Sequence, residues 1–145
     1  MATGNAYYSY KADAFNGSIA LAADVLKVAL LLNTYTPDLV NHDFFDDVSA
    51  HEVANGHGYT TGGATLSGRT VAVDTGTGVA VFDCANPSWT ADVTGFTCRY
   101  AVLYKDTGLA STSPLIAVWD FGGDQNPVDI AFELTVSADG LLDLN

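Results

Sequence analysis

Residues 96–123, FTCRYAVLYKDTGLASTSPLIAVWDFGG, constrain the fold of this chain more than any other stretch. They predict two long strands, residues 96–104 and residues 115–121, joined by a turn and a polar loop. Alternation places bulky apolar side chains on both faces of each strand. In the first strand one face has Cys98, Tyr100, Val102 and Tyr104, and the other has Arg99, Ala101 and Leu103. In the second strand one face has Leu115, Ala117, Trp119 and Phe121, and the other has Ile116, Val118 and Asp120. We therefore expect this pair at the centre of a sheet that is covered on both sides.

Short strands separated by turn signals follow one another from residue 65 onward. The pattern predicts strands at residues 65–74, Val79–Asp83, 89–93, 130–136 and 141–144, with turns at Thr75-Gly76-Thr77-Gly78 and Asp139-Gly140. In residues 130–136 the side chains of Ile130, Phe132, Leu134 and Val136 alternate with those of Ala131, Glu133 and Thr135. This predicts a strand with one buried face and one face in solvent. This spacing is typical of a β-sandwich or jelly-roll-like fold, so we predict a mainly β, single domain over residues 1–145.

The first part of the chain is less regular. Residues 1–18 predict a short N-terminal helix or arm, because Ala6, Tyr10 and Ala14 follow helical spacing. Residues 19–32 fit both a helix and a buried strand, and the pattern leaves the two open. Residues 39–63 predict a long polar and aromatic loop, and a loop of that length in a small domain is often functional.

The charge of the chain limits its partners. Of 145 residues, 17 are acidic and 5 are basic, giving a net charge of −12, and the basic residues are scattered singly as Lys11, Lys27, Arg69, Arg99 and Lys105. Such a charge repels phosphate backbones, so we expect no nucleic-acid partner. The N-terminus has no signal-peptide pattern and the most apolar run, residues 19–32, is too short for a bilayer, so we expect a soluble product made in the cytoplasm and no membrane partner.

Three aspartate triplets suggest catalysis. Asp74-Thr75-Gly76 follows an apolar strand, as in an aspartic protease, and Asp106-Thr107-Gly108 could supply the second carboxylate. Lys105, however, stands where that second motif needs an apolar residue, so a protease using Asp74 is a weaker alternative. Asp120-Phe121-Gly122 matches a kinase triplet without the other kinase motifs. We interpret the first two triplets as turns and the third as a strand end, and we expect no enzyme.

The remaining candidates are metal ligands and thiols. His51 and His57 are six positions apart with Asn55-Gly56 between them, so they do not form the helical pair of a zinc protease. Imidazoles and carboxylates in this loop could bind Zn²⁺ or Mn²⁺, namely those of His42, Asp43, Asp46, Asp47, His51 and His57, but we favour solvated loop residues and predict no metal and no cofactor. Cys84 and Cys98 lack metal-site spacing; buried thiols are favoured over a cross-strand disulfide.

Phrases spread over residues 26–144 resemble a family of small virion structural proteins of tailed bacteriophages. They stand in the expected order: LKVALLLNTYTPD, HDFFDDV, HEV, GYTTGGATLSGRTV, FDCANPSWT, RYAVLYKDTG, SPLIAVWDFGGDQ and AFELTVSADGLLDL. The sequence departs from that family at Cys84 and Cys98, where small residues such as Ala are expected. The departure favours packed thiols, or a pair particular to this protein.

The resemblance implies a virion component assembled in the host cytoplasm. Within that class we expect a capsid decoration, or cement, protein that binds the major capsid protein on the outer surface of the head and forms a homo-oligomer, typically a trimer. The aromatic residues expected to make protein contacts, since aromatics are enriched at interfaces, are Tyr7, Tyr8, Tyr10, Phe15, Phe44, Phe45 and Tyr59. The alternative is a tail or tail-fibre component that binds a receptor or carbohydrate through Tyr59, Trp89 or Trp119.

Overall fold

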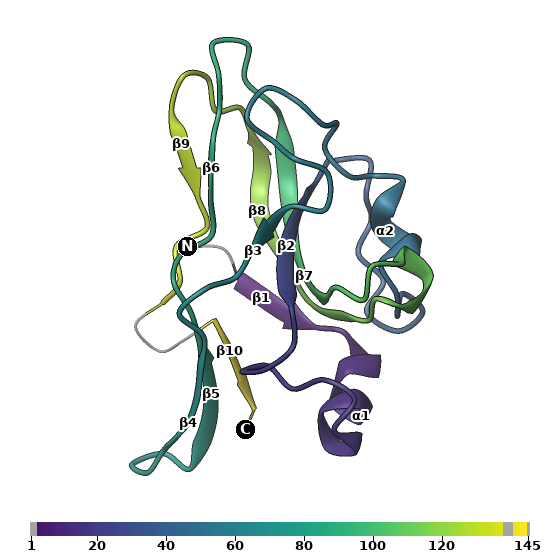
Figure 1. Cartoon of the computed structure of the whole chain (residues 1–145), viewed down its shortest axis with the longest axis vertical. Helices are drawn as coiled ribbons and strands as arrows, with labels where there is room; N and C mark the ends of the chain where they lie inside the picture. The colour runs from purple at the N-terminus through teal and green to yellow at the C-terminus, as the bar shows by residue number, and fades with distance from the viewer. Residues whose placement is uncertain (1–2, 138–140, 145) are drawn as a thin grey trace.

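The chain folds around a five-stranded antiparallel sheet (Figure 1). A computed structural model describes residues 3–137 and 141–144. The strands of the central sheet are, in spatial order, β1 (Thr3–Ala6), β8 (Leu115–Gln125), β7 (Cys98–Lys105), β2 (Leu26–Leu31) and β3 (Ala64–Thr65). The predicted central position of the pair β7 and β8 is confirmed. Residues 26–31 form a strand in which every side chain except Lys27 is buried, which decides between helix and strand.

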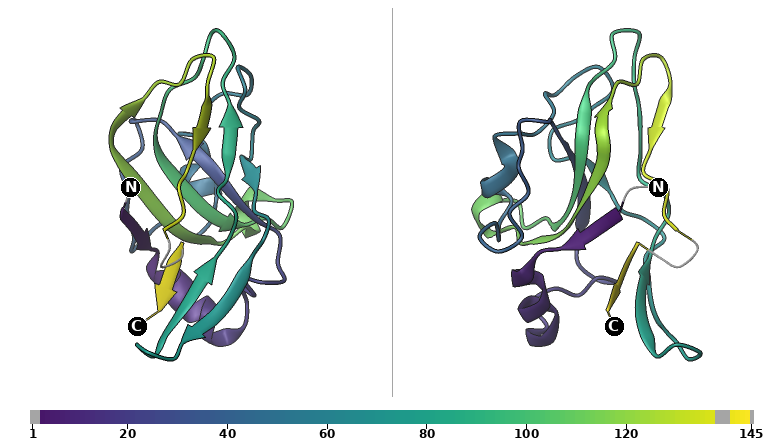
Figure 2. Two further views of the ribbon diagram at one scale, coloured as in Figure 1. Left: turned by 90° about the vertical axis from the view of Figure 1, so that its left-hand side faces the viewer. Right: turned by 180° about the vertical axis from the view of Figure 1, so that it is seen from behind.

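Two smaller sheets lie over one face of the central sheet and complete the predicted mainly β, sandwich-like fold (Figure 2). One has the order β10–β5–β4, from β10 (Leu142–Leu144), β5 (Val79–Asp83) and β4 (Thr70–Asp74). The other pairs β6 (Ser88–Thr90) with β9 (Ala131–Glu133). The first core lies between these layers and includes Leu30, Leu103, Trp119, Phe82 and Trp89.

The second core covers the opposite face of the central sheet. It contains side chains of β2, β7 and β8 together with Tyr7, Tyr35, Phe45 and Val48. Phe45 and Val48 belong to the predicted long loop, residues 39–63, which therefore has ordered structure and includes α2 (Asp46–Ser49). The predicted cover on both faces of the sheet is thus confirmed, and the loop supplies one of the two covers.

The predicted N-terminal helix is α1 (Tyr8–Asn16). It follows β1 directly and ends at Gly17, whose φ of 73° places it in the left-handed region that suits glycine. The N–H groups of Gly17 and Ser18 donate to the carbonyls of Ala14 and Asp13 and close the last turn. No helix in the part of the chain that the structure describes is long and apolar enough to cross a membrane.

Two bulges between β7 and β8 correct the predicted strand faces. Cys98 pairs with Gln125 and Tyr100 with Asp120, so β8 has extra residues here. As a result Cys98 lies in the first core, whereas Tyr100 lies in the second core on the other face of the sheet. A second irregularity, between Leu103 and Tyr104, places Leu115 in the second core. The predictions that Cys98 shares a face with Tyr100 and that Leu115 shares a face with Trp119 were wrong, because alternation holds only in an unbroken register.

Strand ends also differ from the prediction. Strand β8 continues to Gln125 instead of ending at Phe121, and Gly122 adopts a φ of 80° inside it. The predicted strand at residues 130–136 is reduced to β9, and Ile130 is 58% exposed, whereas Leu134 is buried. The predicted turn at Asp139-Gly140 lies outside the described residues.

Candidate functional site

Four of the seven predicted contact residues lie inside the domain. Tyr7, Tyr10, Phe45 and Tyr59 are only 0, 1, 7 and 2% exposed. Tyr59 shows why: its hydroxyl accepts a hydrogen bond from the Leu30 N–H at 3.1 Å and donates one to a Glu52 carboxylate oxygen at 2.6 Å. A tyrosine with its ring in the core and its hydroxyl paired stabilises the fold, so these four side chains do not form an exposed contact surface.

Two of the other three candidates form an exposed face of helix α1. Tyr8 is 56% exposed and Phe15 is 93% exposed. They are seven positions apart, or about two helical turns, so they lie on the same side of the helix. The Lys11 ammonium sits 5.3 Å from the centre of the Tyr8 ring. We call Tyr8, Lys11 and Phe15 the α1 face.

One exposed apolar residue lies near the N-terminal end of the α1 face. The Tyr8 N–H donates to the Leu39 carbonyl at 2.9 Å, which brings the neighbouring Val40, 65% exposed, close to the helix. Phe44, the last predicted contact residue, is half-buried in a bridge with Pro114. The loop at residues 39–63 thus turns its largest apolar groups inward, and the exposed aromatic groups of the predicted set are on α1.

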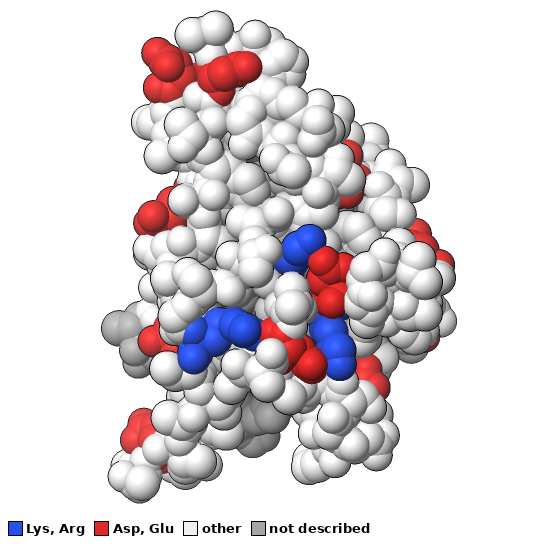
Figure 3. Space-filling view, viewed as in Figure 1, with Lys and Arg blue, Asp and Glu red and all other residues white. Residues whose placement is uncertain are grey.

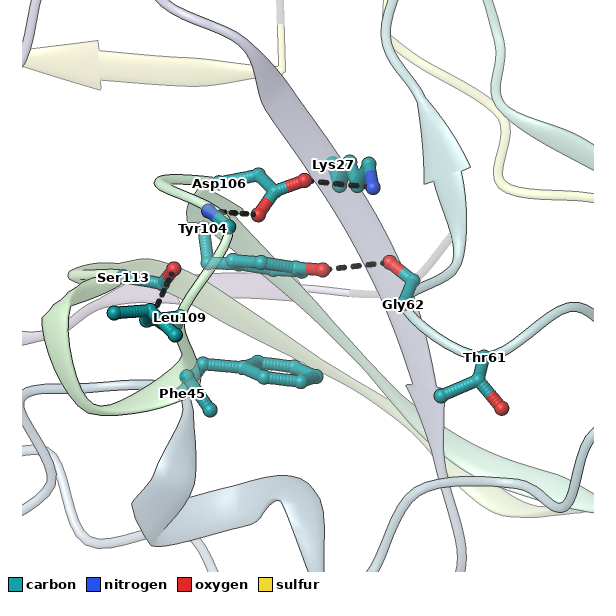
Figure 4. Close-up of a pocket in the computed structure, with 10 residues that line it drawn as sticks. Lys27, Phe45, Thr61, Gly62, Tyr104, Asp106, Leu109 and Ser113 are labelled. Atoms are coloured by element: carbon teal, nitrogen blue, oxygen red, sulfur yellow. Dashed lines mark hydrogen bonds and ion pairs between the residues drawn. The ribbon is translucent and has the colours of Figure 1, made fainter.

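A pocket of about 270 Å³ opens beside the second core (Figure 4). The rings of Phe45 and Tyr104 stack within it, with centroids 4.1 Å apart. The residues that line it are Lys27, Phe45, Thr61, Gly62, Tyr104, Asp106, Gly108, Leu109, Ala110 and Ser113. Sequence patterns did not reveal this pocket, because it joins β2, β7 and two loops that are distant in the chain.

Several polar groups of the pocket already have partners. Lys27 Nζ lies 2.7 Å from the Asp106 carboxylate, and the Tyr104 hydroxyl donates to the Gly62 carbonyl at 2.8 Å. The hydrogen bond from Lys27, followed by that from the Gly108 N–H, lowers the pKa of Asp106. The Ser113 hydroxyl donates to the Leu109 carbonyl at 2.8 Å. A polar ligand would have to displace these hydrogen bonds, which favours a role for these residues in packing the loops over a role in binding a ligand.

In all three aspartate triplets the carboxylate accepts a hydrogen bond from the main-chain N–H of the glycine two residues on. The Asp74 carboxylate accepts hydrogen bonds from the Gly76 N–H and the Thr77 hydroxyl, each at 2.8 Å, in an exposed hairpin. Asp106 and Asp120 hold the N–H of Gly108 and Gly122 in the same way, at 2.9 and 2.8 Å. Such bonds favour the charged carboxylate and lower its pKa at all three positions; at Asp106 and Asp120, hydrogen bonds from Lys27 and Arg99 are the largest cause. The interpretation of the first two as turns is confirmed, although the third lies within β8 and not at its end.

The three histidines have different hydrogen-bond partners, although the Tyr35 ring lies beside both His42 and His51, with centroids 5.6 and 5.7 Å away. The Nδ1 atoms of His42, His51 and His57 lie 3.1 Å from the Tyr35 hydroxyl, 3.0 Å from the Thr34 hydroxyl and 3.2 Å from the Asp92 carboxylate. Within residues 3–137 and 141–144, no three His, Cys, Asp or Glu side chains gather in a way that could hold a metal ion. Cys84 and Cys98 are buried free thiols in the first core, and burial raises their pKa to about 11 and about 12.

The fold assembles a charged cluster that sequence spacing did not show. Basic side chains gather in the middle of one face, with acidic groups between them (Figure 3). Lys105 Nζ lies 3.0 Å from the Asp24 carboxylate, and Arg69 donates to the carbonyls of Leu21 and Asp24. Lys27 and Asp106 form a further ion pair, and Asp106 follows Lys105 directly in the chain. Because each base has an acidic or carbonyl partner, the cluster joins loops and is not a bare positive patch.

The tryptophans proposed for sugar stacking are both buried. Trp89 is 5% exposed and Trp119 is 3% exposed, and both belong to the first core. No protein-family model, curated protein or solved structure matches this chain. The resemblance to virion proteins therefore stays a prediction made from the sequence.

Proposed function

We propose that this chain is a non-enzymatic virion structural protein, a capsid decoration protein that binds the outer surface of a tailed-phage head through the α1 face. The observation that carries the proposal is the 93% exposure of Phe15, two helical turns from the half-exposed Tyr8. A domain that buries Tyr7 and Tyr10 of the same segment leaves these two rings in water. Exposed aromatic groups on one side of a helix are typical of protein contact sites.

The geometry of the α1 face suits insertion into a partner. Phe15 is on the last turn of the helix, beside the left-handed Gly17, so its ring stands at an end of the element. Aromatic side chains that become buried when a partner binds contribute much of the binding energy of protein interfaces. Lys11 adds one positive charge to the face, which favours a partner surface that is apolar with an acidic rim.

The net charge of the chain is consistent with many copies on one shell. A charge of −12 opposes unspecific association between copies at high local concentration. Binding must then come from a defined surface with little acidic charge, and the α1 face meets that condition. The carboxylates that had suggested catalysis, those of Asp74, Asp106 and Asp120, each accept a hydrogen bond from a nearby glycine N–H.

Co-sedimentation with expanded heads that lack the protein tests the proposal. Wild type should sediment with the heads, and a Tyr8→Ser, Phe15→Ser double variant should lose at least about tenfold in affinity, the equivalent of about 1.4 kcal/mol. Val93→Ser is the matched control, because Val93 is 78% exposed and lies outside α1. Equal binding by the double variant and the control would refute the role of the α1 face.

Deletion of residues 1–15 would also remove the α1 face, but it would not test that face alone. That deletion would remove β1 together with the buried Tyr7 and Tyr10, and so would damage the central sheet and both cores. The two serine substitutions change exposed side chains and leave the rest of the helix in place. Unchanged circular dichroism and melting temperature of the double variant would verify that it is folded.

A further inference from the structure

Strand β4 is an exposed edge strand. All five of its residues are exposed, and Val71 and Val73 are 53 and 62% exposed. It hydrogen-bonds to β5 on one side, and the described strand order ends there. In Figures 1 and 2 the β4–β5 hairpin projects from the body of the molecule at the same end as α1.

This edge lacks the features with which proteins usually block strand pairing. Protected edges carry lysines, prolines or bulges. Residues 70–81, TVAVDTGTGVAV, contain neither lysine nor proline, and the pairing of β4 with β5 runs without a bulge from Thr70–Asp83 to Asp74–Val79. Asp74 is the one ionisable side chain in this stretch, and its carboxylate is engaged by its own turn.

The main-chain groups that face the open edge can be assigned. The Asp74 carbonyl accepts a hydrogen bond from the Gly78 N–H at 2.7 Å, so the main-chain groups of Asp74 point toward β5. Main-chain groups alternate in direction along an antiparallel strand. Those of Ala72 therefore also point toward β5, whereas the N–H and C=O groups of Val71 and Val73 point outward.

We propose that the open edge of β4 pairs antiparallel with β4 of a second copy of this chain, about a two-fold axis at Ala72. In this register Val71 lies opposite Val73 of the second copy, so the outward N–H and C=O groups of each meet partners. Ala72 lies opposite Ala72, and Thr70 lies opposite Asp74, so no two like charges are opposed. The four valine side chains lie on one face, where cross-strand β-branched pairs stabilise a sheet. The result is one sheet that continues through both copies.

The self-matching register of β4 favours a second copy as the occupant, since the paired strands place no two charged side chains opposite each other. With a net charge of −12, two copies repel each other over most of their surfaces. At the β4 edge the one charged side chain of each copy, Asp74, lies opposite Thr70 of the other, so the two carboxylates are kept apart when the strands pair as described. A five-residue strand buries less than the roughly 800 Å² per partner of a stable interface, so the dimer should be weak and concentration-dependent.

Sedimentation velocity over a series of protein concentrations, without heads, tests the proposal. Wild type should pass from monomer to dimer as concentration rises. Val73→Pro should raise the dissociation constant at least about tenfold, because proline removes an outward N–H that the β4–β5 pairing does not use. Val93→Pro is the matched control at another exposed valine, and circular dichroism checks that both variants stay folded.

Each outcome decides the question. A monomer at all concentrations overturns the proposal, as does a dimer unaffected by Val73→Pro. A trimer would support the oligomer implied by the resemblance and would also overturn the two-fold contact. Val71→Lys is a second variant that keeps the main chain intact; its added charges close to the axis should weaken a β4-mediated dimer by a similar factor and leave any other dimer unchanged. These results do not depend on head binding, so they are independent of the decoration proposal.

Discussion

The hydroxyl oxygens of Tyr7 and Tyr35 lie 2.8 Å apart in the second core, and 28 positions separate the two residues in the chain. Tyr7 joins β1 to α1, and Tyr35 follows β2, so the bond ties the N-terminal segment to the cover of the central sheet. The Tyr35 hydroxyl also lies 3.1 Å from His42 Nδ1, which extends the network to the long loop. Burial raises the pKa of both phenols, and the electrostatic interaction with Tyr35 raises that of Tyr7 further, so both stay neutral at physiological pH.

Tyr7→Phe should lower the free energy of unfolding by about 1 kcal/mol, the usual value of one buried hydrogen bond. The ring remains to fill the core, and Tyr35 keeps His42 as a partner. Urea denaturation followed by circular dichroism measures the change. Tyr8→Phe, at a side chain that is 56% exposed, is the control and should change stability by less than about 0.5 kcal/mol. Equal effects of the two substitutions would contradict the structural role of Tyr7.

Substitutions at Gly63 and Gly78 distinguish the cost of a left-handed backbone from the cost of a steric clash. Both have positive φ, of 79° and 74°. A Cβ on Gly63 would lie 1.9 Å from the Val28 carbonyl oxygen of β2, whereas one on Gly78 would meet nothing within 4 Å. Gly78→Ala should therefore cost about 1 kcal/mol for the left-handed conformation alone. Gly63→Ala should cost about 3 kcal/mol or more, because it also forces β3 away from β2. Thermal unfolding of the pair checks this, and similar melting temperatures would argue against the close approach of these strands.

The Lys27–Asp106 ion pair should make stability depend on pH in the acid range. Its hydrogen bond lowers the pKa of folded Asp106 below the unfolded value of about 3.9. The stabilising contribution is then fully present above the unfolded pKa and is lost as the pH falls through the folded pKa.

At pH 7 Asp106→Asn should be about 0.5–1 kcal/mol less stable than wild type, since a quarter-exposed pair is partly screened. The difference should shrink as the pH falls through the lowered pKa of folded Asp106, because the aspartate of the wild type then becomes protonated as well. Urea denaturation at several pH values measures it. A difference that stays constant with pH would show that Asp106 acts through something other than its charge.

The two thiols should resist labelling in the folded protein. Burial raises the pKa of Cys84 to about 11 and that of Cys98 to about 12. Since the thiolate is the reactive form, reaction with a disulfide reagent at pH 8 should be at least about a hundredfold slower than in denaturant. Cys98 is completely buried and should react last. Cys98→Ala, which leaves one thiol, assigns the phases; rapid labelling of native wild type would contradict the burial of both cysteines.

The sequence predicted the regular parts of the fold well. Two-sided apolar alternation identified the central pair β7 and β8, and turn residues identified β5 with its bounds Val79–Asp83. It failed where tertiary pairing overrides local pattern. The bulges that move Cys98 and Leu115 to the other face depend on the register between strands, which alternation within one strand cannot reveal.

The candidate surface was only partly predictable for a related reason. Tyr7, Tyr8, Tyr10 and Phe15 form one aromatic cluster in the sequence, yet the fold buries two and exposes two. Helical spacing separates Tyr8 and Phe15 from Tyr10, because the first two share a side of α1. The burial of Tyr7 needed the tertiary partner Tyr35, and the outward main-chain groups of β4 needed the pairing with β5.

Electron cryomicroscopy of expanded heads incubated with the purified protein tests the central claim most directly. The proposal predicts density on the outer surface of the shell into which this domain fits with α1 against the capsid protein and Phe15 inside the contact. Heads without added density, or a fitted domain whose α1 face points to solvent, would contradict it.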